Sequence, residues 1–315
     1  MFAEHPSIQR LSGDRLHLQH GPIDVVLRAW GEPAALARSY QAAAERFGTI
    51  LGELVGELGE LRKPMAGGPQ VSGAVARRMV AACAPFAGIF ITPMAAVAGS
   101  VADELMAAMT AAAPLAKAFV NNGGDIAIYF NRLERDSSGK PLHTFPHPAL
   151  AAGESLEIGI AGDLSHGRAI PAMNGRITLR AGDGIGGIAT SGRGGRSFSL
   201  GIADSVTVLG PSAAAADAAA TLIANAVTIE SPAIRRCPAV QLDPDSDLGE
   251  RPVTVDVGPL TSAEVEAALE NGRRQAEDYR RAGLIAAAAL TLRGQTLTVG
   301  AGLDARRLAR EGTGS

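Results

Sequence analysis

The sequence predicts an α+β protein built from antiparallel sheets, and three observations indicate that class. Strand-like segments come in adjacent pairs joined by tight turns. Long alanine-rich helices separate these pairs, which is the order typical of sheets packed against helices. No GxGxxG opens a helix after a first strand, and no GxxxxGK[ST] occurs. The sequence therefore does not match the commonest nucleotide-binding folds with parallel sheets.

The first third of the chain shows these pairs and helices clearly. Residues Arg15–Ala29 alternate around a Gly21–Pro22 turn, which predicts a hairpin. Apolar residues then recur at helical spacing. The elements expected next are a helix over Ala34–Leu61, a short helix over Val75–Ala82, a strand over Phe86–Ile91 and a helix over Met94–Ala112.

A second hairpin is expected around Asn121–Asp125. The strand-like pieces AFV and IAIY flank Asn-Asn-Gly-Gly-Asp, and Asn-Gly and Gly-Gly are strong tight-turn signals. Asp125 has two readings: it holds the turn through its own backbone, or it ligates a metal or a ribose. A plain hairpin and a ligand-binding hairpin both remain open.

A glycine-rich run, Gly182–Gly210, follows two further expected strands at Leu156–Gly162 and Gly175–Arg180. Its centre reads as a strand that begins at Ile188 and runs into a flexible loop. Successive backbone N–H groups in such a loop form an anion-binding concavity. Arg193 and Arg196 add bidentate donors suited to phosphate or carboxylate, unless they are simply exposed loop charges. Ser197–Leu209 resumes a strand-like pattern.

The next segment, Ser212–Val227, is dense in alanine and predicts a helix. Asp217, Thr221 and Asn225 recur at i, i+4 and i+8, so they share one helix face. Almost every other residue of the segment is small and apolar. This polar stripe therefore faces either water or a site.

The rest of the chain completes one domain. We expect a single domain over residues 1–300 and a flexible tail over 301–315. Asn131–Ser155 reads as a long loop, either a lid or an irregular insertion. The remaining elements expected are a connector over Ile229–Gly249, a strand over Val253–Val257, a helix over Ser262–Ala282, and a hairpin of Leu284–Leu292 with Thr296–Val299.

Composition limits the classes of function. A net charge of −3 and 4% aromatic residues argue against a nucleic-acid binder. No apolar run reaches the length of an uncharged membrane span, and MFAEHPSIQR lacks the features of a signal peptide. Cys83 and Cys237 lie far apart without metal-type spacing, which favours a reducing cytoplasm.

Three motifs taken together resemble a known family. They are Val120-Asn-Asn-Gly-Gly-Asp-Ile126, Ile188-Ala-Thr-Ser-Gly192 and Ala216-Asp-Ala-Ala-Ala-Thr221. Their order and spacing resemble the ApbE superfamily of flavin transferases, once labelled thiamine-biosynthesis proteins, over roughly Ala95–Val227. SFSLGIADSVTVLG followed by ADAAATLIANAV is most similar to a smaller branch of that superfamily.

The resemblance implies a fold and a chemistry. It implies a duplicated T-fold, with antiparallel sheets backed by paired helices, and a homo-oligomer by analogy with T-fold sheets. It also implies FAD cleavage with Mg²⁺ and transfer of FMN to a Thr or Ser of an acceptor protein. Asp217 and Thr221 match the metal-binding Asp and Thr of those enzymes. The residues expected along the flavin nucleotide are Asn122, Gly123, Gly124, Asp125, Thr190, Ser191 and Gly192, followed by the basic Arg193 and Arg196.

The sequence also departs from the ApbE pattern. Ala98 stands where the family has a lysine, and Ser100 where it has an aromatic residue. Arg193–Gly194 replaces an acidic–aromatic pair, and Ser199–Asp204 stands where the family has H-x-I-D-P-x-T-G. Two alternatives to a transferase therefore stay open. One is a non-catalytic flavin or nucleotide binder in cofactor or sulfur metabolism, and the other is a different enzyme that holds an anionic metabolite.

Overall fold

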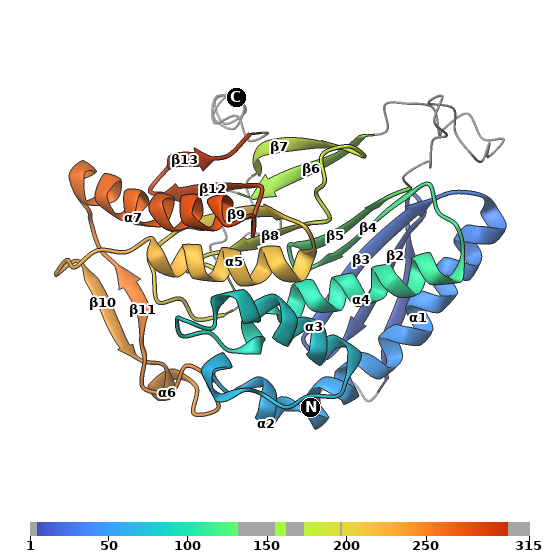
Figure 1. The fold of residues 1–315 in the computed structure, drawn as a ribbon, viewed down its shortest axis with the longest axis horizontal. Coiled ribbons are helices and arrows are strands. Elements are labelled where there is room, and N and C mark those ends of the chain that lie inside the picture. The colour runs from blue at the N-terminus through green and yellow to red at the C-terminus, as the bar shows by residue number, and fades with distance from the viewer. Residues whose placement is uncertain (1–4, 132–154, 162–172, 196, 302–315) are drawn as a thin grey trace.

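A nine-stranded antiparallel sheet forms the centre of the described structure (Figure 1). The computed structural model describes residues 5–131, 155–161, 173–195 and 197–301. In spatial order the strands are β1 (Ser7–Leu11), β2 (Arg15–His20), β3 (Ile23–Trp30), β4 (Lys117–Asn122), β5 (Asp125–Phe130), β8 (Gly187–Ser191), β9 (Ser205–Gly210), β12 (Ala287–Leu292) and β13 (Gln295–Val299).

Long helices cover one face of this sheet (Figure 1). They are α1 (Pro33–Gly56), α4 (Val97–Ala112), α5 (Ala213–Ala226) and α7 (Ser262–Arg281). A hairpin, two long helices and a second hairpin follow one another twice along the chain. The predicted α+β fold, with antiparallel strands packed against helices in a T-fold-like order, is confirmed.

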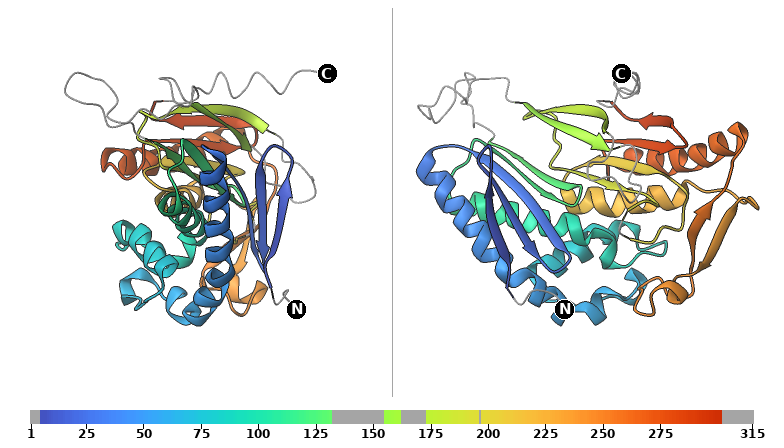
Figure 2. Two further views of the ribbon diagram at one scale, coloured as in Figure 1. Left: turned by 90° about the vertical axis from the view of Figure 1, so that its right-hand side faces the viewer. Right: turned by 180° about the vertical axis from the view of Figure 1, so that it is seen from behind.

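A short hairpin covers part of the opposite face (Figure 2). Its strands are β6 (Ser155–Ala161) and β7 (Met173–Arg180). Leu156 and Ile177 of this hairpin pack with Ile126 and Ile188 of the main sheet. Strands β9 and β12, covered on both faces, are buried along their whole lengths.

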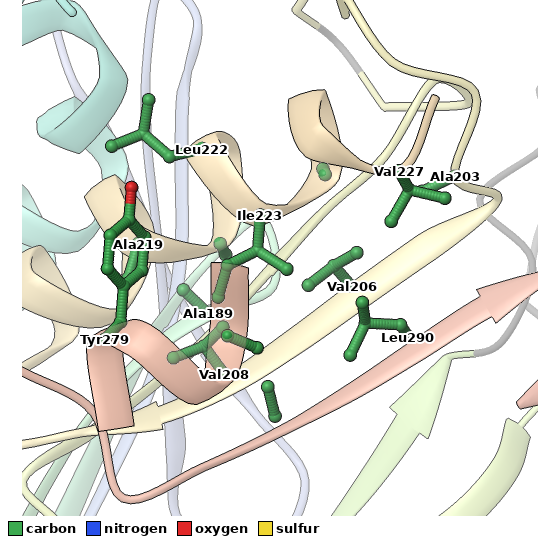
Figure 3. Packing of buried hydrophobic residues seen from close by; sticks show 14 of the residues in the cluster. Ala189, Ala203, Val206, Val208, Ala219, Leu222, Ile223, Val227, Tyr279 and Leu290 are labelled. Atoms are coloured by element: carbon green, nitrogen blue, oxygen red, sulfur yellow. The ribbon is translucent and has the colours of Figure 1, made fainter. Parts of the chain in front are cut away.

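The helix-side core shows why this sequence forms these elements. In β3, Ile23, Val25 and Leu27 are buried at alternate positions, as a half-covered strand requires. In α5, small alanines let the helix lie close to β8 and β9, while Ile223 and Leu222 fill the space between α5 and its neighbours (Figure 3).

Shorter elements complete the chain. They are α2 (Leu58–Leu61), α3 (Ala74–Cys83), α6 (Ala239–Leu242), the 3₁₀ turns η1 (Met65–Gly67), η2 (Ala84–Phe86) and η3 (Pro93–Ala96), and the strands β10 (Ile234–Pro238) and β11 (Pro252–Val257). The helical stretch Pro93–Ala112 has the length and composition of a membrane span among the described residues. However, 44% of its apolar window is buried inside the protein.

Three expectations for local structure were wrong. Phe86–Ile91 is not a strand, because Phe86 ends the 3₁₀ turn Ala84–Phe86, which contains Pro85, and is buried against Tyr279. In Ser197–Leu209 only the part from Ser205 onwards is a strand. The connector Ile229–Gly249 contains β10 and α6. The predicted loop over 132–154 and the tail over 302–315 lie outside the described residues.

Candidate functional site

The β4–β5 turn is the first part of the candidate site. Asn122 pairs with Asp125, so Gly123 and Gly124 form a two-residue turn with φ values of 66° and 114°. Residues other than glycine rarely adopt such φ values. The Asn121 Oδ1 atom accepts a hydrogen bond from the Gly124 amide at 2.8 Å. The predicted hairpin is confirmed, and the Asn121 side chain bonds the turn.

Asn122 and Asp125 are both buried beside the N-terminal turn of α4. Asn122 Nδ2 donates to the Ala98 carbonyl at 3.1 Å, whereas Asn122 Oδ1 is buried without a hydrogen-bond partner among the described residues. Asp125 Oδ1 accepts from the Thr190 backbone N–H at 3.2 Å. The turn thus presents a carboxylate and an unsatisfied amide oxygen beside α4.

Helix α5 places Asp217 against the same turn of α4. Ser212 caps α5 by accepting from the Ala215 amide, so the helix begins where the sequence predicts. One turn later, Asp217 Oδ2 accepts from the Gly99 amide at 3.0 Å. Asp217 therefore takes the place of a capping residue for α4, whose own N-cap, Ala96, provides no side-chain bond.

Electrostatics sets Asp217 apart from an ordinary carboxyl group. Burial raises the pKa of Asp217 well above its usual value, and the charge of Asp125 raises the pKa further. Hydrogen bonds from the Gly99 and Ala98 amides oppose that rise, while Asp103 adds to it. No lysine or arginine of the described chain forms an ion pair with Asp217.

Asp103 holds the start of α5 in return. Its carboxylate accepts from the Ala213 amide at 3.1 Å and from the Ala214 amide at 2.9 Å. Burial raises the pKa of Asp103, and these two amide bonds oppose the rise. The two helices are also very close at Gly99, where a Cβ atom would lie 2.3 Å from the Ala213 carbonyl oxygen.

Cys83, the last residue of α3, lies near this cluster. Burial raises the pKa of the Cys83 thiol, and the charge of Asp217 raises that pKa further. The thiol donates to the Thr92 carbonyl at 3.4 Å. A buried thiol with a raised pKa is a poor nucleophile, so Cys83 lines the site without reactive chemistry.

The predicted anion-binding loop is only partly turned toward this cluster. The Thr190 amide reaches Asp125, but the Thr190 hydroxyl is hydrogen-bonded to Thr207 Oγ1 at 2.9 Å. Ile188 packs under β6–β7 and Ala189 under the helices, so the Thr190 side chain lies on the face away from α5. Ser191 is the next residue on the helix face.

Beyond Ser191 the loop is held by packing against the backbone and by an ion pair. Gly192 is buried, and a Cβ atom there would lie 2.5 Å from the Asp204 carbonyl oxygen. Arg193 forms an ion pair with Asp204 at 3.4 Å, and Asp204 also accepts from the Arg293 amide. The charge of Arg193 is thus matched by Asp204, and Arg196 lies outside the described residues.

The polar stripe on α5 divides between two roles. Asn225 Oδ1 accepts from the Leu200 amide at 3.0 Å and fixes the chain beside the end of α5. Thr221, one turn from Asp217, is half-buried. Within the described part of the chain, no hydrogen bond engages the Thr221 hydroxyl. The stripe therefore uses Asn225 for structure, and Asp217 and Thr221 remain its candidate ligand-binding residues.

The donor set fits a hard divalent cation that keeps several non-protein ligands. Among the described residues no group of three His, Cys, Asp or Glu side chains forms a metal centre by itself. Oxygen donors are nevertheless present in the Asp217 carboxylate and the Thr221 hydroxyl, with the unsatisfied Asn122 Oδ1 nearby. Mg²⁺ commonly binds through one or two carboxylates and completes its shell with water and substrate phosphates.

Motif reasoning on the sequence missed two features of this site. The Gly99 amide is one, and its signal was the small residues at the start of a long helix, where backbones approach closely. The other is Cys83, which no sequence pattern connects to Asp217 because their contact is purely tertiary.

Comparison with known proteins now places the chain. The family model described as "AbpE bacteria" matches residues 8–137 and 148–298. The fold and the site together define the class of protein. It is a T-fold-like protein with an acidic site between α4, α5 and the β4–β5 turn. The chain belongs to this bacterial AbpE family, which confirms the ApbE-like resemblance of its motifs.

Individual relatives are similar over parts of the chain. A UPF0280 protein of Methanopyrus kandleri is 31% identical over 196 residues, covering 61% of this chain and 65% of that protein. A UPF0280 protein of Methanothrix thermoacetophila is 33% identical over 184 residues, covering 56% of this chain and 65% of that protein. The chain thus spans just under two thirds of the length of these relatives.

Solved structures of ApbE proteins are also similar over most of the chain's length. An ApbE protein of Thermotoga maritima is 13% identical, with a TM-score of 0.46, covering 94% of this chain and 96% of that one. The flavin transferase ApbE of Vibrio cholerae is 12% identical, with a TM-score of 0.41, covering 94% of this chain and 98% of that one.

Proposed function

We propose that this protein binds a flavin nucleotide, or another phosphorylated ligand, together with Mg²⁺ at the Asp217 site. One observation carries the proposal. Asp217 is held beside Asp125, with its pKa raised and without an ion-pair partner in the described chain. A buried carboxyl group such as that of Asp217, which no lysine or arginine of the described chain pairs with, is costly to ionise unless a cation binds beside it. Membership of the AbpE family makes a flavin nucleotide the first ligand to test.

Each residue has a definite part in this proposal. Asp217 and Thr221 would hold the cation. When bound, the cation would neutralise charge on a pyrophosphate and so favour its cleavage. The glycine turn at Gly123 and Gly124 would let the ligand approach the backbone closely, and Asn122 would offer its unsatisfied oxygen to the bound group.

The loop after β8 contributes less directly. Thr190 fixes Asp125 through its amide, Ser191 is the next residue of β8 on the helix face, and Gly192 packs against the Asp204 backbone. Because Asp204 neutralises Arg193, a site for an anionic metabolite centred on Arg193 is less favoured than one centred on Asp217. Arg196 remains a proposed anion donor from sequence.

The wider setting is also part of the proposal. Both cysteines are free, which agrees with a reducing cytoplasm, where we place the protein. We further propose a homo-oligomer, a single duplicated domain over residues 1–300 and, if transfer occurs, a Thr or Ser of an acceptor protein as the FMN target.

A titration tests the binding step. Flavin fluorescence is followed as the protein is added to FMN or FAD, with Mg²⁺ or with EDTA. We expect binding that strengthens with Mg²⁺, and we expect Asp217→Asn and Thr221→Val to remove the Mg²⁺ dependence. A matched control is Asp278→Asn, which changes an exposed carboxylate on α7. Flat titrations of the unaltered protein with FMN, FAD and ATP would contradict the proposal.

Chromatography of the same mixtures separates an enzyme from a binder. Release of AMP from FAD, and flavin attached to a protein of a cell lysate, would support transfer. Mg²⁺-dependent binding without either product would identify a non-catalytic flavin protein.

A further inference from the structure

Helices α4 and α5 are joined by hydrogen bonds between a carboxylate of each helix and the N-terminal amides of the other. Asp103 of α4 accepts from the first two amides of α5, those of Ala213 and Ala214. Asp217 of α5 accepts from the amide of Gly99, in the first turn of α4. Each helix therefore supplies the carboxylate that satisfies the exposed amides of the other.

This pairing leaves little room for the helices to shift. A Cβ atom at Gly99 would lie 2.3 Å from the Ala213 carbonyl oxygen, so the two helix starts touch through their backbones. Asp217 bonds the Gly99 amide and Asp103 bonds the Ala213 amide, so both residues of that contact are held by a carboxylate of the other helix. A change in the Asp103 contact would move the start of α5, and Asp217 lies only four residues further along.

A carboxylate at position 103 has an electrostatic cost. It is partly buried, and it lies near enough to Asp217 for the two charges to repel. A hydrophobic or neutral side chain would fill the same space without that repulsion. The aspartate accepts two amide hydrogen bonds here, one at each carboxylate oxygen. An asparagine has only one acceptor oxygen and could not accept both in this way.

We propose that Asp103 is a positioning residue: by clamping the first two amides of α5 onto α4, it fixes the Asp217 carboxylate in the place from which Asp217 would hold a divalent cation together with Thr221. Asp103 touches neither the cation nor the ligand. It acts through the helix start, in the way that outer-shell partners orient the ligands of metal sites. The inference rests on the proposed cation site for its ligand, but its structural part stands on the contacts alone.

Two variants disturb the clamp by different chemistry. Asp103→Asn keeps the shape but sets an NH₂ group against one of the α5 amides. Gly99→Ala leaves Asp103 intact and pushes α5 away by steric contact. Thr261→Ala is the control, because it removes the N-cap of α7 and lowers stability without removing any hydrogen bond of α4 or α5.

The probe is Mn²⁺, which is paramagnetic and resembles Mg²⁺ in its preference for oxygen ligands. Its binding to the full chain is measured by electron paramagnetic resonance, with thermal unfolding recorded for every variant. We expect Asp103→Asn and Gly99→Ala to weaken Mn²⁺ binding about 10-fold to 100-fold. We expect Thr261→Ala to lower the melting temperature by roughly 2–4 °C and to leave Mn²⁺ affinity unchanged.

Hydrogen exchange in the absence of metal gives a second readout. The Gly99 amide should exchange faster in Asp103→Asn than in the unaltered protein and in Thr261→Ala, because Asp217 no longer holds it. If the unaltered protein binds no Mn²⁺, the proposed cation site fails. If it does bind Mn²⁺ and both clamp variants match Thr261→Ala in affinity and exchange, the positioning role is overturned.

Discussion

Asp217 carries an electrostatic cost in the metal-free protein that an asparagine would not. A carboxyl group whose pKa is raised by folding binds its proton more tightly in the folded state than in the unfolded state. Its ionisation therefore removes stability as the pH rises from the ordinary value of 3.8 through the raised value. Above both values the full cost is present.

We predict that Asp217→Asn stabilises the metal-free protein at pH 8, while it abolishes cation binding. The gain comes from removing the buried charge, because each unit by which folding raises a pKa costs about 1.4 kcal/mol once the group is ionised. Urea unfolding in EDTA at pH 8 and again near pH 4 measures it, and the gain should shrink toward the lower pH.

The exposed Asp278→Asn supplies the comparison for that measurement. Its partner Arg281 is on the same exposed helix face, so we expect a change within about 0.5 kcal/mol at either pH. A loss of stability in Asp217→Asn at pH 8 would show that the amide bonds from Gly99 and Ala98 outweigh the buried charge.

Individual residues were predictable from sequence where a local rule applied. The turn at Gly123 and Gly124 follows from backbone sterics, and Asp217 with Thr221 follows from helical spacing. The engagement of Arg193 by Asp204 was not predictable, because this loop contact depends on how 193–204 returns on itself. The same limit applies to Asn225 and Leu200.

At the scale of elements, α5 is held to the sheet by glycines that permit backbone contact. A Cβ atom at Gly187 in β8 would lie 2.1 Å from the Ala213 amide nitrogen. We predict that Gly187→Ala lowers the free energy of unfolding by roughly 1–3 kcal/mol, the usual cost of overpacking. Chemical denaturation followed by circular dichroism measures this loss.

Gly182→Ala is the matched control for Gly187→Ala. Gly182 is exposed, and nothing lies within 4 Å of the position its Cβ would occupy. We therefore expect no loss of stability from that change. Equal effects of the two substitutions would mean that the close approach of β8 and α5 adds nothing to stability.

Elements were predictable where capping residues or turns mark their ends. Helix α7 begins at the Thr261–Glu264 capping box, and α5 begins at Ser212, both within a residue of the prediction. The strand predicted over Phe86–Ile91 was wrong, because hydrophobic content alone does not distinguish a strand from a buried turn. Pro85 was the signal against a strand.

At the scale of the whole molecule, the sheet is protected unevenly. Strands β9 and β12 are buried throughout, whereas the edge strand β1 is almost wholly exposed. We predict that amide hydrogens of β9 and β12 exchange slowest and those of β1 fastest, since exchange follows local opening. Hydrogen-exchange mass spectrometry checks the order, and fast exchange in β12 would contradict it.

The arrangement of the hairpins into one sheet could not be predicted from the sequence. Local pattern identifies each hairpin, but the pairing of β5 with β8 joins residues about 60 positions apart. The fold class followed from element order, and the three motifs lie together around α4, α5 and the β4–β5 turn, where we place the candidate site. Their meeting is a product of that long-range pairing.

The β5–β8 pairing has a mechanical consequence for the whole sheet. Only Ile126 with Ile188 and Ala127 with Gly187 are in register there, whereas the β4–β5 pair has six such positions. The side chain of Asp125 continues this seam by accepting the Thr190 amide. Asp125 thus adds a side-chain contact to the shortest strand pairing of the described main sheet. A ligand that engaged the Asp125 carboxylate would compete with the Thr190 amide for it, and would therefore act on the strand pairing that joins the N-terminal and C-terminal parts of the sheet.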